Sequence, residues 1–327
     1  MNIWYEAHAT LFQTTAIYVL LALSFQVVLK SGIFSFASVG AFGIGAYTAA
    51  NLANRGVPLI VTLLIVVVAM AAVGYLLAIP LMHLRGLYLG MVTFAIDEIL
   101  VVVATNGGKI TGGAVGLFGV PLEITTLGLG LVAVIGVLLV SQLERHSVGR
   151  AIEVLRGDEQ LARSVGVEVG NYRKLIFALS AALGGVAGAL NTLNFSTVTP
   201  GSFGFTLIVA GLTMAIVGGI GSWRGAVLGA IFVAWFPAVS SALGGYRSIV
   251  YGVLVILVVA YEPDGLLGII RWVIRGGRGQ LARRRSAVPA PAGAAPATPP
   301  GDSPAAPAGG SLASASELGR SGHDATS

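Results

Sequence analysis

Two adjacent acids, Asp97 and Glu98, interrupt an apolar stretch that runs from residue 86 to 106. A carboxylate at the centre of a bilayer costs roughly 2.5 to 3.5 kcal/mol, so it normally faces a cavity or a partner and marks a functional site. Neighbouring positions of a helix point about 100° apart, and the two acids therefore cannot serve one narrow site equally. Glu98 could instead cap a helix break or pair across a helix interface, a structural role that the sequence leaves open.

Two polar segments could form the outer mouth of a path through the protein. In the first, Thr111 precedes Gly112 and Gly113, and their backbone N–H groups could bind a carboxylate, although such a loop could also simply reverse the chain. In the second, Asn191 and Asn194 precede a stretch broken by Gly and Pro. We expect both segments to lie on the outer side of the protein.

A charged loop covers residues 144–174 and holds six basic and five acidic residues. Apolar residues recur in it at helical spacing while charged residues take the other faces, which predicts a short amphipathic helix or helix pair. Gly166 is well placed to end that helix. The nearly balanced charge favours a protein partner over an anionic lipid surface, although a merely solvated or lipid-bound helix is the alternative.

Motifs for a nucleotide, a metal or a catalytic centre are incomplete. The third glycine of VGGIGSWRG falls at 225, where a dinucleotide fingerprint requires 224, and NGGK at 106–109 lacks the glycine that a P-loop requires at 103. The chain has no cysteine, and its histidines have no metal-ligand neighbour at i+3 or i+4. We therefore expect no cofactor, metal or catalytic residue in this chain; consecutive acids on one helix fit a hydrolase poorly.

The elements that position these residues are hydrophobic helices. Charged residues make up 10% of the 327-residue chain, against roughly 25% in soluble domains. We predict an all-α polytopic membrane protein with about eight to ten transmembrane helices. The second candidate segment is rich in Gly, Ser and Ala and could be broken or re-entrant. The candidate segments lie near residues 10–29, 32–53, 57–82, 86–106, 125–143, 172–194, 205–221, 225–243 and 247–262.

Small residues recur at four-residue spacing in two of these segments. Glycines at this spacing leave one stripe of the helix without side chains, which lets neighbouring backbones approach closely in a membrane. We predict helix packing rather than ligand contact for both stripes, which are Gly184–Gly188 and Gly221–Gly225–Gly229.

Basic residues predict the orientation. With loop 144–174 in the cytoplasm and nine alternating spans, fifteen Lys or Arg of residues 1–285 face inward and only Arg55, Lys109 and Arg247 face outward. The C-terminus is then cytoplasmic. We divide the chain into a transmembrane domain at 1–270, a basic juxtamembrane segment at 271–285 and a tail at 286–327, whose Ala, Pro, Gly and Ser composition predicts disorder.

Residues 149–190 resemble the coupling segment and following helix of the permease subunits of branched-chain amino acid ABC transporters. QLARSVG at 160–166 is similar to the EAA-x3-G loop of ABC importers, with Gln160 and Leu161 in place of the first two letters. Further resemblance, in the family's order and to its LivM-like member, is carried by IGAYTAA at 44–50, TGGAVGLFGVP at 111–121, VGGIGSWRGAVLGA at 217–230 and PDGLLG at 263–268.

The resemblance implies a multi-pass subunit of the inner or plasma membrane that passes a branched-chain or other hydrophobic amino acid inward by alternating access. ATP would be hydrolysed by separate ATP-binding subunits. The other implied partners are a second, homologous permease, an extracytoplasmic substrate-binding protein and the bilayer; no nucleic acid is implied. Two alternatives are a permease for urea or short amides and an ion-coupled secondary carrier that uses Asp97 or Glu98 as a proton relay.

The resemblance also assigns residues to two roles. Glu98 aligns with the acid usually present in the family, whereas Asp97 is additional, and residues 32–40 lack the family's usual Ser-Leu-Gly-(His/Gln) pattern. Glu98 is thus the better candidate for the substrate path, together with Thr111, Gly112, Gly113, Asn191 and Asn194. The residues implied in ATPase coupling are Gly149, Arg150, Leu155, Arg156, Asp158, Glu159, Leu161, Ala162 and Gly166.

Overall fold

The computed structural model describes residues 3–84, 86–121, 124–146, 149, 168–239, 252, 265, 266 and 268. Contacts divide the chain into one unit at residues 1–279 and another at 280–327, and all described residues belong to the first. The predicted coupling helix at 149–168, the ninth hydrophobic segment at 247–262 and the C-terminal tail lie mostly or wholly outside the described residues.

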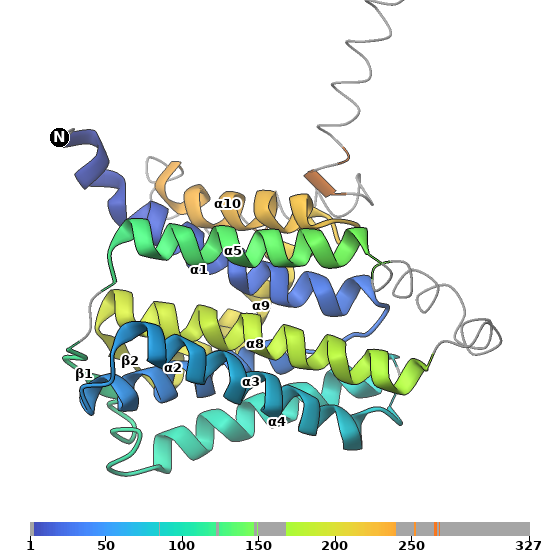
Figure 1. Cartoon of the computed structure of the whole chain (residues 1–327), viewed down its shortest axis with the longest axis horizontal. Helices are drawn as coiled ribbons and strands as arrows, with labels where there is room; N and C mark the ends of the chain where they lie inside the picture. Colours follow the sequence, from blue (N-terminus) through green and yellow to red (C-terminus); the bar gives the residue numbers. More distant parts are fainter. Residues whose placement is uncertain are drawn as a thin grey trace, which may run out of the picture. The chain divides into compact units, whose positions relative to one another are not determined.

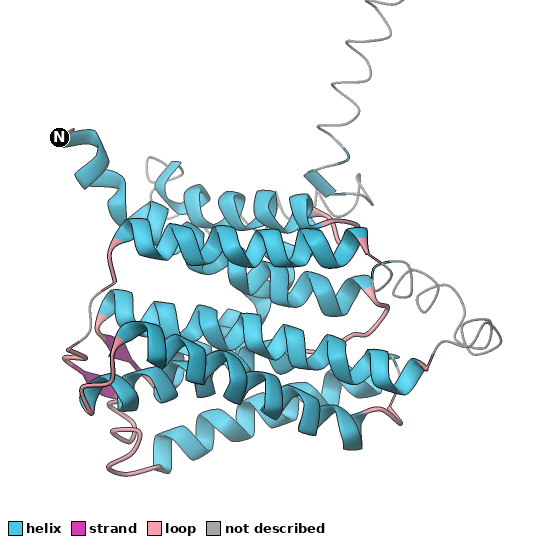
Figure 2. Cartoon of the chain, in the orientation of Figure 1, coloured by secondary structure: helices cyan, strands magenta, loops and turns pink. Residues whose placement is uncertain are grey.

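Within the described ranges the fold is a bundle of long helices with one very short sheet (Figures 1 and 2). Eight of the nine predicted hydrophobic segments form helices, with ends within a few residues of those expected apart from an earlier start of the first, so the all-α prediction is confirmed. The helices are α1 (Ile3–Lys30), α2 (Ala37–Asn54), α3 (Leu59–Leu81), α4 (Gly86–Asn106), α5 (Thr126–Arg145), α8 (Val169–Phe195), α9 (Phe205–Gly218) and α10 (Trp223–Val239).

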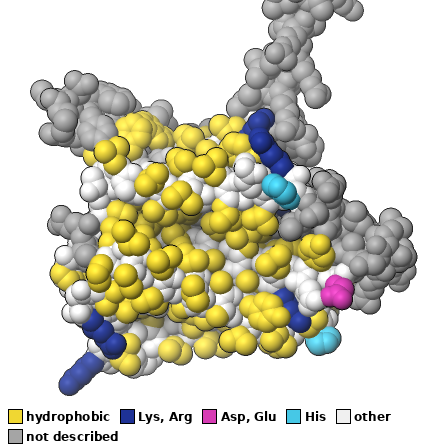
Figure 3. Space-filling model, in the orientation of Figure 1, with side chains coloured by type: hydrophobic (Ala, Val, Ile, Leu, Met, Phe, Trp, Pro, Cys, Tyr) yellow, Lys and Arg dark blue, Asp and Glu magenta, His cyan; other side chains and the backbone are white. Residues whose placement is uncertain are grey.

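The surface of the bundle is apolar enough for a membrane. Six segments of the described chain are long and hydrophobic enough to cross a bilayer, within α1, α3, α4, α5, α8 and residues 200–218. Large apolar side chains of α3, α4 and α5 are exposed, as a lipid-facing surface requires. Figure 3 shows hydrophobic side chains over most of one face, with Lys and Arg confined to its left and right ends.

Helix α2 is unbroken, so the suggestion of a broken or re-entrant segment is wrong. It extends for 18 residues, about 27 Å at 1.5 Å per residue, and two thirds of its residues are buried. It packs against α8, α3 and α4. Its abundance of Ala, Gly and Ser reflects this central position, because small side chains let three neighbouring helices approach it.

The glycine stripes are helix contacts, as predicted. A Cβ at Gly184 or Gly188 of α8 would overlap a backbone carbonyl of α2, at Ser38 and Phe42 respectively. Gly225 and Gly229 of α10 meet the backbone of α9 and the turn after it in the same way. Gly221 differs from the prediction because it lies in the turn before α10, where a Cβ would meet nothing within 4 Å.

A two-stranded sheet joins the two segments that were expected to form outer mouths. Strand β1 (Leu117–Phe118) pairs antiparallel with β2 (Thr197–Val198), in the register Leu117↔Val198. The 3-10 helix η1 (Pro200–Phe203) follows β2. We call this end of the bundle, with β1, β2 and η1, the β end (Figure 1). The two segments therefore share one end, as the predicted alternation of spans requires; its assignment to the outer side stays a prediction.

Candidate functional site

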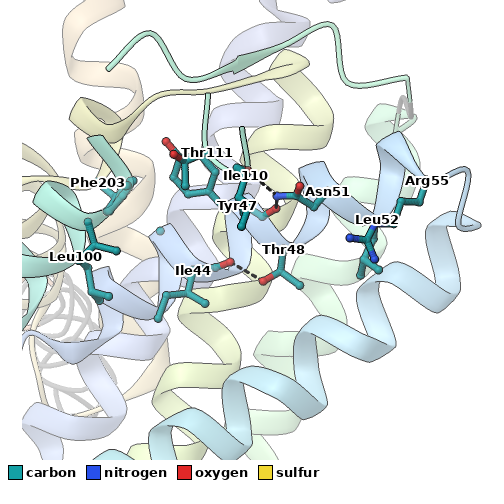
Figure 4. A pocket seen from close by; sticks show the side chains of 13 residues that line it. Ile44, Tyr47, Thr48, Asn51, Leu52, Arg55, Leu100, Ile110, Thr111 and Phe203 are labelled. Atoms are coloured by element: carbon teal, nitrogen blue, oxygen red, sulfur yellow. Dashed lines mark hydrogen bonds between the residues drawn. The ribbon is translucent and has the colours of Figure 1, made fainter. Parts of the chain in front are cut away.

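A cavity of about 430 Å³ opens at the β end between α2, α4, the segment after α4 and η1 (Figure 4). This volume falls in the range of small-molecule sites, about 300 to 1,000 Å³. We call it the β-end cavity. Its lining is mostly apolar, with a few polar groups from one side of α2. The lining residues are Gly43, Ile44, Tyr47, Thr48, Asn51, Leu52, Arg55, Leu100, Val103, Ala104, Ile110, Thr111 and Phe203.

Three polar side chains of the cavity come from α2 at four-residue spacing, which places Tyr47, Asn51 and Arg55 along one stripe of the helix. The Asn51 amide donates to the carbonyl of Tyr47 at 2.8 Å and to that of Ile110 at 3.1 Å, so it fastens the segment after α4 to α2. Tyr47 is 8% exposed, and its ring contacts that of Phe203 edge-on, with 5.9 Å between the ring centroids. The Tyr47 hydroxyl has no hydrogen-bond partner among the described residues.

Arg55 is the charged residue among those that line the cavity. It caps the C-terminal end of α2 and is exposed. A guanidinium at the rim of an apolar cavity can bind a carboxylate by paired hydrogen bonds. The apolar wall formed by Ile44, Leu100 and Phe203 suits an aliphatic group. The cavity thus combines the two features that would hold a hydrophobic carboxylic or amino acid.

Of the predicted mouth residues, only Thr111 lines the β-end cavity. Its hydroxyl accepts a hydrogen bond from the N–H of Gly113 at 3.3 Å, so that N–H is already used. Gly112 and Gly113 have φ of +73° and +64° and turn the chain, a conformation that glycine favours. Asn191 and Asn194 are at the β end of α8 and do not line the cavity; the Asn194 amide nitrogen is buried without a partner in the described structure.

The two acids of α4 lie in different surroundings. Asp97 is 0% exposed and lines a second, much smaller cavity of about 20 Å³, whereas Glu98 is half-buried and lines neither cavity. Both oxygens of Asp97 and one of Glu98 lack a hydrogen-bond partner in the described part of the chain. No three His, Cys, Asp or Glu side chains of the described residues converge as a metal site requires. The role predicted for Glu98 stays a prediction.

A polar cluster joins three helices at the other end of the bundle. The carboxylate of Glu144, on α5, accepts hydrogen bonds from the Gln26 amide at 2.8 Å and from the N–H of Trp223 at 3.1 Å. The same oxygen lies 3.2 Å from the ammonium of Lys30. We call these four residues the Glu144 cluster. A single carboxylate thereby links α1, α5 and the first residue of α10, directly before the charged loop.

Among the residues implied in ATPase coupling, the structure describes only Gly149, which lines a small cavity with Gln26, Lys30 and Glu144. A Cβ at Gly149 would overlap the backbone of Glu144. The others lie outside the described residues: Arg150, Leu155, Arg156, Asp158, Glu159, Leu161, Ala162 and Gly166.

Sequence reasoning missed Tyr47, Asn51 and Arg55, although one pattern could have indicated them. Polar residues at 47, 51 and 55 repeat every four positions in a segment whose other residues, apart from Asn54, are apolar or small, and the last of the three is basic. Leu100, Val103 and Phe203 carry no such pattern. They meet α2 only because α4 and η1 fold against it, which no local spacing reveals.

An apolar helical bundle with six segments long enough to cross a bilayer and a cavity open at one end has the architecture of a polytopic membrane protein. The chain matches, over residues 8–259, the family described as the branched-chain amino acid transport system / permease component, and it belongs to that family. No solved structure matches it significantly.

Curated relatives agree with this assignment. The chain is 31% identical to the high-affinity branched-chain amino acid transport system permease protein LivM of Escherichia coli (strain K12), over 79% of this chain and 69% of that protein. It is 32% identical to LivH of the same strain over 45% of this chain and 49% of that protein. It is also 33% identical to BraD of Pseudomonas aeruginosa over 38% and 41%.

Proposed function

We propose that this chain is a translocation subunit of an ATP-driven importer for branched-chain or other hydrophobic amino acids. It pairs with a second permease subunit and receives cargo from an extracytoplasmic binding protein. ATP is hydrolysed by separate subunits that dock on residues 149–168. Membership of the family and similarity to LivM over most of the chain support this proposal.

The observation that carries the proposal is the β-end cavity, whose size and chemistry fit an amino acid with an aliphatic side chain. Arg55 would attract the cargo carboxylate, and Ile44, Leu100 and Phe203 would receive the side chain. We assign the β end to the outer side because loop 144–174 then lies with the excess of basic residues in the cytoplasm. Cargo would enter at this end and leave near the Glu144 cluster.

The test is uptake of radiolabelled leucine into proteoliposomes that hold the complete transporter, with the binding protein outside and ATP inside. We expect uptake that requires ATP and persists when an uncoupler removes the proton gradient. Uptake that continues without ATP and stops with the uncoupler would instead indicate an ion-coupled secondary carrier. Uptake of urea or acetamide in preference to leucine would assign the transporter to short amides.

A further inference from the structure

The small cavity beside α4 contains an acid, Asp97, and none of the residues that line this cavity is basic. Asp97 is 0% exposed, the backbone N–H of Gly40 approaches its carboxylate, and neither oxygen makes a hydrogen bond of normal geometry in the described structure. It is the only ionisable side chain among the residues that line this cavity, which we call the Asp97 cavity. An ionised carboxylate is costly to bury without a partner. A residue of this kind marks a place where a ligand can supply the missing charge.

The fit between α2 and α4 is built around this carboxylate. The hydroxyl of Thr93 accepts a hydrogen bond at 3.0 Å from the N–H of Phe36, which joins α4 to the start of α2. One helical turn further along both helices, Asp97 lies against Gly40, where a Cβ would overlap the carboxylate. The absence of a side chain at Gly40 therefore provides the space that Asp97 occupies.

The Asp97 cavity and the β-end cavity are neighbours. Ile44 and Leu100 line both, so these two side chains form the partition between them. The rest of the Asp97 cavity is apolar apart from Ser35 and Ser180. The Ser180 hydroxyl donates to the carbonyl of Ser24 at 2.9 Å, and that of Ser35 accepts from the N–H of Ala37 at 3.3 Å. Asp97 is thus the only ionisable side chain among the residues that line the cavity below the partition.

We propose that Asp97 is a specificity residue of the translocation path, whose carboxylate receives the primary ammonium group of the cargo after it passes Ile44 and Leu100. This inference rests on the proposed function. Arg55 lines the outer cavity and would bind the carboxylate of a zwitterion, and Asp97 lines the inner cavity and would bind its ammonium group at a later step. A neutral amide or urea has no ammonium group to offer, so Asp97 selects amino acids against such cargo.

The present conformation is closed at this point. A cavity of about 20 Å³ has room for a group the size of one water molecule, not for a whole amino acid. The ammonium group can reach Asp97 only when α2 and α4 separate, and the contact at Gly40 closes again after the cargo has left.

Two analogues of leucine test the proposal. Each of them keeps the leucine side chain but only one of the two charged groups. 3-Methylbutylamine has only the ammonium, and 4-methylpentanoate has only the carboxylate. Each competes with leucine uptake by the complete transporter. We expect Asp97→Asn, which keeps the shape and removes the charge, to weaken inhibition by the amine about tenfold, because a charged hydrogen bond contributes about 1.5 kcal/mol or more. Inhibition by the acid should not change, and Asp97→Glu should stay close to the wild type.

Glu98→Gln is the matched control, since it removes the neighbouring charge on another face of the same helix. It should leave the ratio of amine to acid inhibition as in the wild type, whatever it does to the total rate. An equal effect of Asp97→Asn on both analogues, or none on either, would overturn the proposal. If the wild type itself takes up no leucine with ATP, the proposed function fails, which is a different result.

A second measurement retains Asp97, so it does not depend on whether Asp97→Asn folds. The chain has no cysteine, and Ile96 lines the Asp97 cavity. In Ile96→Cys, a thiol reagent should react more slowly when 3-methylbutylamine is present and at the normal rate with 4-methylpentanoate. Equal protection by both analogues, or by neither, would assign Asp97 to a bound proton or water and contradict an ammonium site.

Discussion

Arg55 and Asp97 place opposite charges at two levels of one apolar route. Arg55 is exposed at the rim of the β-end cavity, whereas Asp97 is fully buried behind Ile44 and Leu100. Water screens the first charge and not the second. The two residues should therefore act differently: Arg55 on how readily cargo is captured, and Asp97 on which cargo passes.

Arg55→Gln tests capture at the rim. We expect leucine uptake to fall by up to about fivefold, because an exposed ion pair contributes about 1 kcal/mol or less. Leucine uptake should fall less in Arg55→Lys, since lysine keeps the positive charge and loses only the paired hydrogen bonds of the guanidinium. The measurement is the initial rate of uptake into proteoliposomes at low cargo concentration. Lys109→Gln is the control, because Lys109 is an exposed basic residue of the same end that does not line the cavity; an equal fall there would indicate a general effect of surface charge.

Glu98→Gln tests the acid that the family resemblance favours. One Glu98 oxygen is buried without a partner in the described structure, although the residue lines neither cavity. We expect a severalfold lower rate of leucine uptake with normal assembly of the subunit, because an unpartnered acid in a membrane helix normally serves a path or an interface. Uptake and the amount of purified complex are measured together. Full uptake would show that Glu98 is dispensable for transport, and loss of the complex would assign it to packing.

At the scale of elements, the sequence predicted the helices well and their contacts poorly. Long apolar runs defined α3, α4 and α5 almost to the residue, because a membrane-spanning helix needs only length and apolarity. The sheet was not predicted, since strands of two residues separated by about 80 positions carry no periodic pattern. The β-end cavity was missed for the same reason: it forms where α2, α4 and η1 meet.

Helix α2 shows how a weak local pattern can be read. Its many small residues suggested a break, but they are contact surfaces for neighbouring elements: Gly45 meets Gly185 of α8, and Gly40 meets Asp97 of α4. Glycine lowers helix propensity by about 1 kcal/mol, and close packing of the two backbones offsets that loss in the membrane. The stripe at 47, 51 and 55 also lies on this helix. One element therefore carries both a packing surface and part of the candidate site.

Gly188→Val tests the contact between α2 and α8. The new side chain would overlap the carbonyl of Phe42, so the helices must separate, and overpacking typically costs about 1 to 3 kcal/mol. We expect a lower yield of folded subunit and a lower midpoint of thermal unfolding in detergent. Gly221→Ala is the matched control, because a Cβ there meets nothing within 4 Å. A normal unfolding midpoint for Gly188→Val would show that the two helices can move apart at little cost.

At the scale of the whole molecule, the orientation in the membrane decides how cavity and loop cooperate. The segments after α4 and α8 share the β end, whereas α5 ends at the opposite end, at the Glu144 cluster before the charged loop. The charge distribution predicts that this opposite end is cytoplasmic. Cargo entry and ATPase docking are then separated by the length of the bundle.

Single cysteines can establish this orientation because the chain has none of its own. We expect Ser147→Cys and Ser303→Cys to react with an impermeant thiol reagent only from the cytoplasmic side. Thr199→Cys, next to β2, should react only from the outside. Labelling is compared in right-side-out and inverted membrane vesicles. The reverse pattern at Ser147 would remove the basis for an ATPase contact through residues 149–168.

The last prediction concerns how the motion of an ATPase would reach the cargo route. The first residue of the charged loop, Glu144, lies in the last turn of α5. It joins α5 to α1 through Gln26 and Lys30 and to the first residue of α10, Trp223. A displacement of the loop would therefore act on three helices at once. In the loop itself, the sequence predicts that Leu155, Leu161 and Ala162 form the apolar side of a helix and that Gly166 ends it.

Ala162→Glu places a charge on that apolar side, and Gly166→Val replaces the residue best suited to positive φ. We expect both variants to insert normally and to lose cargo-stimulated ATP hydrolysis in the reconstituted transporter. Ser164→Glu is the control, because it adds the same charge on the polar side of the same predicted helix and should retain stimulation. Full stimulation and normal ATPase binding in the first two variants would mean that residues 149–168 are not the coupling element. The better interpretation of the loop would then be a helix on the lipid surface, in which the charged residues of the helix contact water and lipid head groups.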